Sequence, residues 1–482
     1  MAQTPAAAPP PSLAPPAADP ALARALRALP LVAGILAIAA LGWWLASTNL
    51  KPDARKPTKE NVPEDGAKGI DLSGTFTAGT GKAGDQPGSW PGYRGPGATG
   101  VVVGGPALNA AFPESGPKAL WSVKVGFGYA SPAVKDGRVY LLDYDVDKKA
   151  DALRCLSLTD GAEIWRRSYQ VMVKFNHGMS RTVPAIAGAN VVSFGPKCHV
   201  LCVDAVSGDY RWGLDLARTY ETKDPPWYAG QCPLVDDGKV ILAPAGKQVM
   251  LVAIDVATGK PIWTTPNTPG WAQSHSSVVV ATLAGRKQYV YFASGGLLGV
   301  DAADGKLLWH TDAFKVTIAA MPAPVVVGDD RLFVAGGYNA GCVLMKVSKD
   351  GETFTPSIVW RKPAKDFGSD QHTPLFIDGL IYGVIPDGQL VCMDLDGKRR
   401  WASGTGNRFG IGPYLAGGGA LWVMNDSGTL TTAEVTSEKY HQLARAKVLT
   451  GHDSWGPMTL VGTRLIVRDL DHMTCLDVGV GK

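Results

Sequence analysis

The sequence predicts an all-β fold, an eight-bladed β-propeller with four-stranded antiparallel blades, preceded by one transmembrane helix. The first observation is a repeated motif whose cleanest copy, residues 253–263, reads A-x-D-x-x-T-G-x-x-x-W. The second is a group of short β-type runs in each repeat, and the third is an uncharged apolar stretch near the N-terminus. Successive copies of the motif lie 41 to 51 residues apart, a period typical of propellers and solenoids.

Each repeat carries four short runs with strand character, as in residues 131–134, 138–142, 153–156 and 163–165. Four antiparallel strands make one propeller blade. The Gly of the last turn supplies the positive φ of a tight hairpin, and the Trp that follows can pack its ring between neighbouring blades. We therefore interpret seven repeat tryptophans as structural: Trp121, Trp165, Trp212, Trp263, Trp309, Trp360 and Trp401.

The starts of the first strands indicate eight blades. The eighth has strand signals near residues 458–461, 464–468 and 473–476, but none for a fourth strand before Lys482. A separate β run, residues 119–123, precedes blade one. We expect this N-terminal strand to complete blade eight, which would close the ring and remove an exposed sheet edge.

The repeat resembles that of the quinoprotein (PQQ-like) propeller family, which includes PQQ-dependent alcohol dehydrogenases and the propeller lipoprotein of the outer-membrane assembly machine. Residues 89–96, Ser-Trp-Pro-Gly-Tyr-Arg-Gly-Pro, resemble the W-P-x-F-R-G-P opening of PQQ-like propeller proteins of planctomycete-type bacteria. The resemblance covers the chain from about Trp90 to its end. It implies the fold strongly and the function weakly, since one fold hosts many functions.

Four segments precede or form the predicted domain. Residues 1–27 form an Ala- and Pro-rich tail that we expect to be disordered. Residues 28–46 carry no charge and approach the roughly 20 residues of a membrane-spanning helix, so we predict a signal anchor. A cleaved signal peptide is the alternative. Residues 47–88 are predicted to be a flexible linker, and residues 89–482 the propeller.

The membrane orientation has two conflicting indications. Arg24 and Arg27 lie on one side of the apolar stretch, whereas four cations lie on the other, so the positive-inside rule favours a cytoplasmic propeller. Propellers of the resembled family are usually extracytoplasmic, and we expect a periplasmic location on that ground. No Cys precedes Cys155, which excludes a lipoprotein anchor like that of the assembly propeller.

Most cysteines follow the repeat. Cys155, Cys202, Cys392 and Cys475 share one position on the third strand, where other repeats carry a small residue. This pattern indicates a small buried packing site rather than a metal or disulfide site. The vicinal Cys pair and the C-x-x-C-H haem motif of quinoprotein dehydrogenases are absent from the sequence.

The loops that enter the first strands border the central funnel of a propeller, which makes them the candidate binding region. Histidines in these loops fall in alternate blades, and His275 and His372 share one offset, which makes this pair a weak metal candidate. A water-filled polar channel is the alternative. The funnel-lining candidates are His177, Arg181, Tyr228, Gln231, Trp271, His275, Asp370, Gln371, His372, His452 and Trp455.

These observations favour a non-catalytic binding or scaffold module at the cell envelope, with a protein or glycan partner. A quinoprotein-type oxidoreductase using PQQ or a divalent metal in the funnel is one alternative, and a structural subunit of a membrane protein complex is another. No cofactor is required by any local motif, and no catalytic residue can be named. The net charge of +4 is scattered, without a basic run, which gives no support to nucleic-acid binding.

Overall fold

The structure is a computed structural model that describes residues 36–41, 43, 69–175 and 177–481. The chain divides into two units, residues 1–68 and 69–482. The predicted tail, residues 1–27, lies outside the described residues. Of the predicted transmembrane segment, residues 36–41 and 43 are described and helical. Among the described residues, no helix is both long and apolar enough to cross a membrane, and the anchor stays a prediction.

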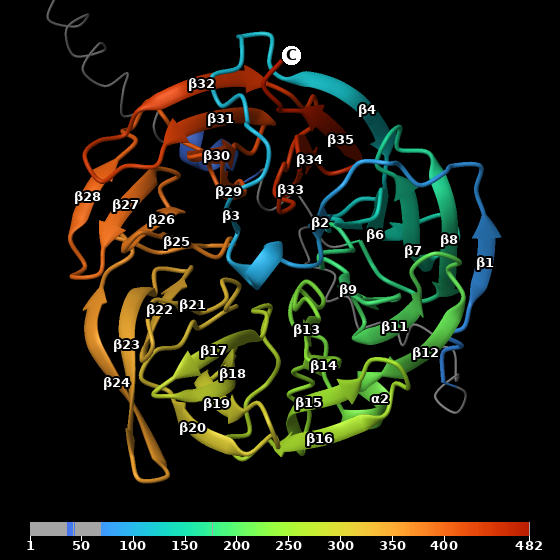
Figure 1. Cartoon of the computed structure of the whole chain (residues 1–482). Helices are drawn as coiled ribbons and strands as arrows, with labels where there is room; N and C mark the ends of the chain where they lie inside the picture. The colour runs from blue at the N-terminus through green and yellow to red at the C-terminus, as the bar shows by residue number, and fades with distance from the viewer. Residues whose placement is uncertain (1–35, 42, 44–68, 176, 482) are drawn as a thin grey trace, which may run out of the picture. The chain divides into compact units, whose positions relative to one another are not determined.

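The second unit is a ring of eight antiparallel blades with four strands each (Figure 1). In blades one to seven the four strands are consecutive in the sequence, whereas the fourth strand of blade eight comes from before blade one. This confirms the predicted eight-bladed propeller. The strands of blades one to four are β5 (Ala133–Lys135), β6 (Arg138–Asp145), β7 (Ala150–Ser157), β8 (Glu163–Gln170); β9 (Ala185–Ala187), β10 (Asn190–Phe194), β11 (His199–Asp204), β12 (Tyr210–Asp215); β13 (Leu234–Asp236), β14 (Lys239–Leu242), β15 (Val249–Asp255), β16 (Pro261–Pro266); and β17 (Val279–Leu283), β18 (Arg286–Ala293), β19 (Gly296–Asp301), β20 (Leu307–Thr311).

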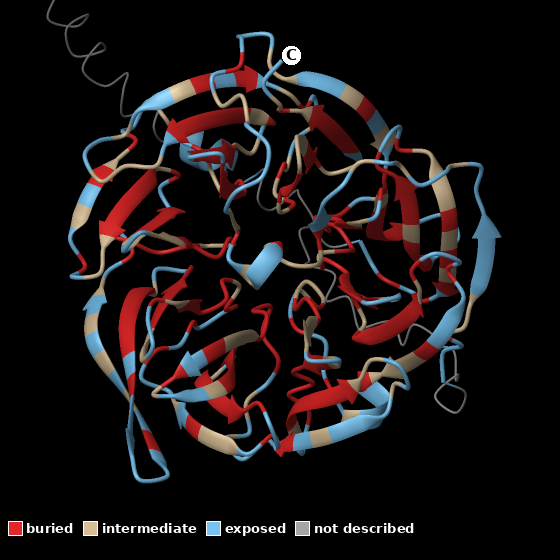
Figure 2. Ribbon diagram, viewed as in Figure 1, coloured by how far each residue is buried: buried red, intermediate tan, exposed pale blue. Residues whose placement is uncertain are grey.

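Blades five to eight repeat the pattern, and a short helix, α2 (Leu216–Tyr220), follows β12. Their strands are β21 (Val325–Val326), β22 (Arg331–Gly336), β23 (Gly341–Asp350), β24 (Thr353–Lys362); β25 (Leu375–Ile377), β26 (Leu380–Val384), β27 (Leu390–Asp394), β28 (Arg399–Ala402); β29 (Tyr414–Gly417), β30 (Ala420–Met424), β31 (Thr429–Glu434), β32 (Gln442–Lys447); and β33 (Thr459–Val461), β34 (Arg464–Arg468), β35 (His472–Asp477), β4 (Lys118–Lys124). Second and third strands are buried almost throughout, whereas outer strands alternate buried and exposed residues (Figure 2).

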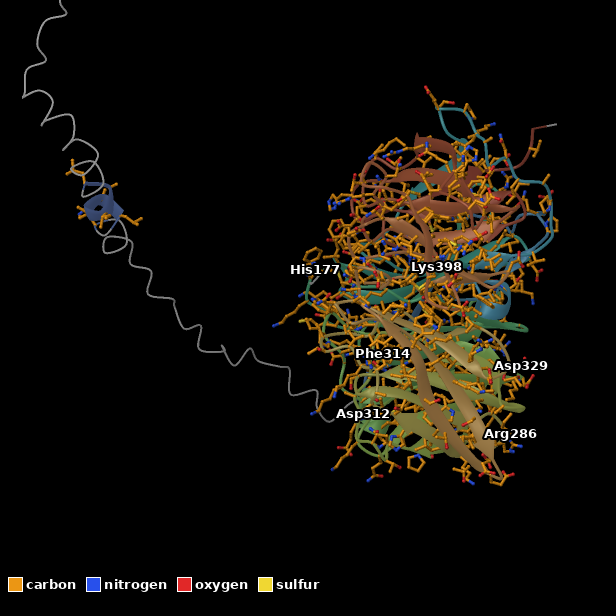
Figure 3. All side chains as sticks on the ribbon, turned by 90° about the vertical axis from the view of Figure 1, so that its left-hand side faces the viewer. His177, Arg286, Asp312, Phe314, Asp329 and Lys398 are labelled. Atoms are coloured by element: carbon orange, nitrogen blue, oxygen red, sulfur yellow. The ribbon has the colours of Figure 1, made fainter. Side chains whose placement is uncertain are left out.

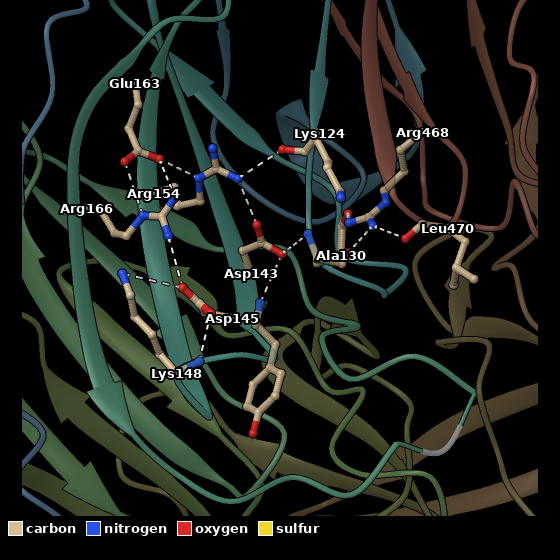
Figure 4. Close-up of polar contacts among 12 residues, drawn as sticks. Lys124, Ala130, Asp143, Asp145, Lys148, Arg154, Glu163, Arg166, Arg468 and Leu470 are labelled. Atoms are coloured by element: carbon tan, nitrogen blue, oxygen red, sulfur yellow. Dashed lines mark hydrogen bonds and ion pairs between the residues drawn. The ribbon is translucent and has the colours of Figure 1, made fainter.

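The ring closes as predicted. Strand β4, from before blade one, pairs antiparallel with β35 as the fourth strand of blade eight. On the channel side, the buried Arg468 of β34 donates to the carbonyl oxygens of Ala130 (2.9 Å) and Leu470 (2.8 Å) (Figure 4). Because Ala130 leads into blade one, this side chain joins the last blade to the first.

The repeat Trp and the turn Gly of the next blade form one contact. A Cβ placed on Gly208 of blade two would lie 2.8 Å from the indole of Trp165 in blade one, and Gly208 also has a φ of +72°. Glycine is therefore required at this position for two reasons: it adopts the positive φ without strain, and it has no side chain to clash with the indole. The same contact joins Trp121 to Gly161, Trp212 to Gly259, Trp263 to Gly305 and Trp360 to Gly397.

The third-strand position predicted to need a small residue lies directly opposite the Trp of its own blade. Cys155 pairs with Trp165 across the strands, and Ala253 pairs with Trp263. At Gly299, a Cβ would lie only 2.2 Å from the indole nitrogen of Trp309, so a large side chain cannot fit beside the ring. All seven cysteines are described, buried and free of disulfides. Burial raises the pKa of the Cys155 thiol to about 12, which keeps it unreactive.

The predicted boundary between linker and propeller needs correction. Residues 69–88 belong to the propeller unit. Within them, β1 (Thr75–Ala78) pairs with β8 on the outer edge of blade one, and the guanidinium carbon of Arg167 lies 5.7 Å from the Phe76 ring centroid. Strand pairing therefore orders a Gly- and Thr-rich stretch whose composition indicated a linker.

We expect deletion of residues 118–124 to abolish stable folding, since blade eight would lose its fourth strand and the ring its closure. Thermal unfolding followed by circular dichroism measures this. Deletion of residues 75–78 is the matched control, because blade one keeps four strands without β1, and it should fold. An unchanged melting temperature in the first deletion would refute closure by β4.

We expect Trp165→Ala to lower the free energy of unfolding by about 3–5 kcal/mol, because it empties a buried site between blades. Gly208→Ala should cost more than Gly238→Ala, since Gly238 also has positive φ but has no atom within 4 Å of an added Cβ. In the Trp165→Ala background the extra cost at Gly208 should shrink, leaving only the 3.0 Å approach of the new Cβ to the Phe76 ring. Equal costs at the two glycines in denaturant titrations would show that the indole contact is unimportant.

Candidate functional site

A segment of residues 89–102, which we call the strap, crosses the central channel. It contains β2 (Ser89–Trp90), a 3-10 turn η2 (Pro96–Ala98) and β3 (Val101–Val102). Strand β2 pairs with β5 of blade one and β3 pairs with β29 of blade seven, so η2 lies across the middle of the ring (Figure 1). The motif that resembled the family opening thus forms the strap.

Arg94 fastens the strap to blade six. Its guanidinium donates to the carbonyl oxygens of Thr373, Pro374, Ala98 and Thr99. The hydroxyl of Tyr93 lies 3.0 Å from Oγ1 of Thr373. Tyr93, like Cys232 and Ser277, lines the spaces on both sides of the strap and lies at the boundary between them.

On one side of the strap, the mouth loops of the blades enclose a cavity of about 270 Å³. We call it the mouth cavity. Figure 3 views the disc edge-on and shows His177, which lines this cavity, on the face opposite to Asp329. The lining consists of Tyr93, Tyr129, His177, Arg181, Trp227, Gly230, Cys232, His275, Ser277, Met321, Tyr338, Gln371, His372, Ile411, Trp455 and Pro457.

Aromatic rings and one cation dominate this lining. The ring centroids of Tyr129 and Trp455 lie 5.2 Å apart, and the guanidinium carbon of Arg181 lies 5.3 Å from the Tyr129 centroid. Arg181 also donates to the carbonyl oxygen of Trp227 at 2.6 Å and to that of His177 at 3.2 Å. Burial lowers the pKa of Arg181 to about 10, so it remains charged at neutral pH. The lining contains no carboxylate.

The two central histidines are neutral. Burial, and next the charge of Arg181, lower the pKa of His275 to about 4. Burial, and next Arg94, lower the pKa of His372 to about 3. Nε2 of His275 lies 2.7 Å from the carbonyl oxygen of Pro226 and must therefore carry the proton, which leaves Nδ1 as an acceptor. Within the described part of the chain, Nδ1 of His275 and Nε2 of His372 are buried and have no hydrogen-bond partner.

The structure places six of the eleven predicted funnel residues in this lining: His177, Arg181, His275, Gln371, His372 and Trp455. The other five lie elsewhere. Gln231 is fully buried and exchanges hydrogen bonds with the backbone of Ala243. The Tyr228 hydroxyl bonds to the backbone of Lys174.

Trp271, Asp370 and His452 also lie outside the mouth cavity. The Trp271 ring packs edge-on against His310 at 5.7 Å between centroids. Asp370 lines a separate small space beside Gln371. The side chain of His452 is 76% exposed and pairs with Asp453 at 3.3 Å. An offset from a strand start identifies the loop, but it does not decide which way a side chain turns.

Several lining residues carry no repeat signal. Tyr93 comes from the strap, and Met321, Tyr338 and Ile411 lie in loops that the histidine pattern does not mark. Tyr93 could have been found from its place in the opening motif. Three lining residues, His177, Trp227 and Tyr338, hold positive φ without being Gly. Such strained positions cluster at functional sites, which supports the mouth cavity as the site.

The donor set does not fit the metal of a quinone site. Ca²⁺ takes hard oxygen ligands, mostly carboxylates. The lining of the mouth cavity contains no Asp or Glu. His275 and His372 could serve a softer ion, but the nearby Cys232 has a pKa raised to about 11 by burial, and its sulfur accepts from the Val183 N–H. Within the described part of the chain, three metal-capable side chains do gather at Asp469, Asp471 and His472. The Asp469 carboxylate already accepts from the backbone N–H groups of Asp471 and His472 in its own turn and of Gly451.

Comparisons with known proteins agree on the architecture. The solved structure of BamB from Moraxella catarrhalis is similar at 15% identity, with a TM-score of 0.53 over 75% of this chain and 99% of that chain. Quinohemoprotein alcohol dehydrogenase from Comamonas testosteroni matches at 15% identity and a TM-score of 0.44, over 83% of this chain and 82% of that chain. The likeness to BamB shows the fold alone. No curated protein sequence matches the chain significantly.

The model of one protein family, described as outer membrane protein assembly factor BamB, matches residues 148–403. This match spans more than half of the chain and includes blades two to six completely. The chain therefore belongs to this family of PQQ-like β-propellers.

Proposed function

We propose that this protein is a membrane-anchored, non-catalytic binding or scaffold module of the cell envelope. The observation that carries the proposal is the mouth cavity, an aromatic recess without carboxylates whose floor is closed by Tyr93. Membership in a family described as an assembly factor of outer membrane proteins supports a protein partner and an envelope location. The uncharged segment 28–46 would hold the propeller at the membrane, on the periplasmic side.

The cavity has the size and chemistry for one ring-shaped group. Its volume of about 270 Å³ lies just below the roughly 300–1,000 Å³ of small-molecule pockets, so it can take a sugar ring or an aromatic side chain but not a folded domain. Tyr129, Trp227 and Trp455 offer flat surfaces for such a ring. The positive charge of Arg181 disfavours a cationic guest.

A quinoprotein-type oxidoreductase is the second candidate, favoured by the same aromatic walls, since a flat quinone also stacks on rings. The residues present do not supply the oxygen ligands of its metal, so we derive no reaction step from it. A third candidate, a structural subunit of a membrane protein complex, would use the rim of the disc and leave the mouth cavity unused.

The purified full chain should show no Ca²⁺-dependent binding of PQQ, because the cavity lacks carboxylate ligands. Tryptophan fluorescence and absorbance are followed during titration with PQQ, with and without Ca²⁺. A stoichiometric complex that requires Ca²⁺ and is lost in His372→Ala would establish the oxidoreductase candidate instead. His441→Ala, a change at an exposed histidine paired with Glu434, is the matched control.

The full chain should sediment with membranes and stay there through an alkaline carbonate wash. Leu36→Arg with Leu41→Arg should release it, since each charge at the centre of a spanning helix costs about 2.5–3.5 kcal/mol. In spheroplasts, external protease should digest the wild-type propeller. Protection of the propeller would place it in the cytoplasm, as the flanking cations favour.

A further inference from the structure

The inner edges of several blades are occupied by the chain itself. Where the first two strands of a blade are joined by a two-residue turn, the residue before the last pair turns its N–H and C=O away from the partner strand, because hydrogen-bonded and non-hydrogen-bonded pairs alternate. Ile186 of β9 donates this outward N–H to the Pro91 carbonyl at 2.7 Å, and Ala416 of β29 donates to the Gly100 carbonyl at 2.9 Å. The strap thus adds backbone to the edges of blades two and seven, as β2 does in blade one.

The first strands of blades three and four have the same kind of inner edge, but the strap forms no backbone hydrogen bond with them among the described residues. The last hairpin pairs are Asp236 with Lys239 and Leu283 with Arg286, each closing a two-residue turn. The backbone N–H and C=O groups that point outward are then those of Val235 in blade three and of Thr282 in blade four. Val280, two residues before Thr282, points the same way. Within residues 69–175 and 177–481, none of the turn, loop or side-chain hydrogen bonds uses the N–H of these three residues.

These uncovered edges line a second cavity of about 540 Å³, on the other side of Tyr93 from the mouth cavity. We call it the strap groove. One wall is the strap, residues 91–95 and 97–99, and the other is made by the first strands of blades two to six. Strand β17, with five residues, is the longest first strand in the ring and lies in the middle of this wall.

The charges in the strap groove are already paired. Asp236 accepts from Lys287 Nζ at 2.9 Å and from the Tyr289 hydroxyl at 2.7 Å. The Arg94 guanidinium is held by backbone carbonyls. The remaining wall is largely aliphatic, with Val280 and Val326 partly exposed. An uncharged guest with aliphatic side chains suits such a wall, whereas a phosphate or a nucleic acid finds no available cation there.

We propose that the strap groove receives an extended, uncharged segment of a partner protein, which pairs edge-on with β17. Backbone is the guest because the groove offers a row of outward peptide groups, and the strap already satisfies the equivalent groups of neighbouring blades with backbone. The groove is continuous with that strap interface, so the partner segment extends an arrangement that the fold uses itself. This site is separate from the mouth cavity, and it does not depend on the ligand proposed there.

The test uses the full chain and a synthetic peptide, acetylated and amidated, whose uncharged core Thr-Val-Thr-Val-Thr-Val carries one Lys at each end for solubility only. Fluorescence anisotropy of the labelled peptide gives the affinity, and hydrogen exchange gives the protected amides. We expect binding, protection of the Val280 and Thr282 amides, and a loss of affinity of at least tenfold in Thr282→Pro, which removes an outward N–H.

Two controls separate backbone pairing from side-chain contact. Thr282→Val keeps the N–H and should bind within about twofold of wild type, since a single changed side chain at an edge has a small effect. A peptide N-methylated at alternate residues on one edge should not bind, and this control needs no change in the protein. Val280→Pro provides a second variant if Thr282→Pro melts much earlier than wild type.

Other occupants of the groove give different results. Protection of Val280 and Thr282 in the dilute chain without peptide would mean that another part of the same chain covers the edge. Protection that rises with protein concentration, together with dimers in light scattering, would mean a second copy. Either result overturns the proposal, as does absence of peptide binding or an equal loss of affinity in Thr282→Val.

Discussion

The pairing of β4 with β35 is the interaction on which the other contacts of the ring depend. It joins strands from opposite ends of the propeller, so blade eight is complete only when the chain has come full circle. It also continues the contact between blades. Trp121 of β4 packs against Gly161 of blade one, and its indole N–H donates to the Leu158 carbonyl at 3.0 Å. Without β4, one interface between blades would lose both its Trp and its strand, and the edge of β35 would face water.

Most blades are held by the same few relations, which explains the regularity of the repeat, although Leu344 faces Trp360 in blade five. The Trp needs a small residue opposite it on the third strand and a Gly above it in the next blade. The indole N–H finds a carbonyl of that next blade in several repeats, as in Trp212 with Val256 at 2.9 Å and Trp360 with Leu395 at 2.8 Å. Selection for this one contact therefore constrains residues far apart along the chain.

A closed ring of eight blades leaves an axial channel, and the strap divides it. Tyr93 faces both sides, so one segment forms the floor of the mouth cavity and a wall of the strap groove. The two sides differ in chemistry. The mouth cavity offers aromatic rings and neutral imidazoles, whereas the strap groove offers aliphatic side chains and peptide groups. A binding module with two unlike recesses on one axis can hold two different guests, while the ring around them stays rigid.

Residues at fixed spacing predict the blade count, the roles of the repeat tryptophans and the closure of the ring without any structure. They also locate the loops of the mouth cavity, since every first strand begins there. Which loop side chains meet depends on how the chain packs in three dimensions. Gln231 and His275 lie in equivalent loops, yet Gln231 bonds to the Ala243 backbone and His275 lines the cavity. The course of the strap, and the ordering of residues 69–88 by β1, were likewise beyond the sequence, because both depend on hydrogen bonds between distant segments that leave no periodic pattern.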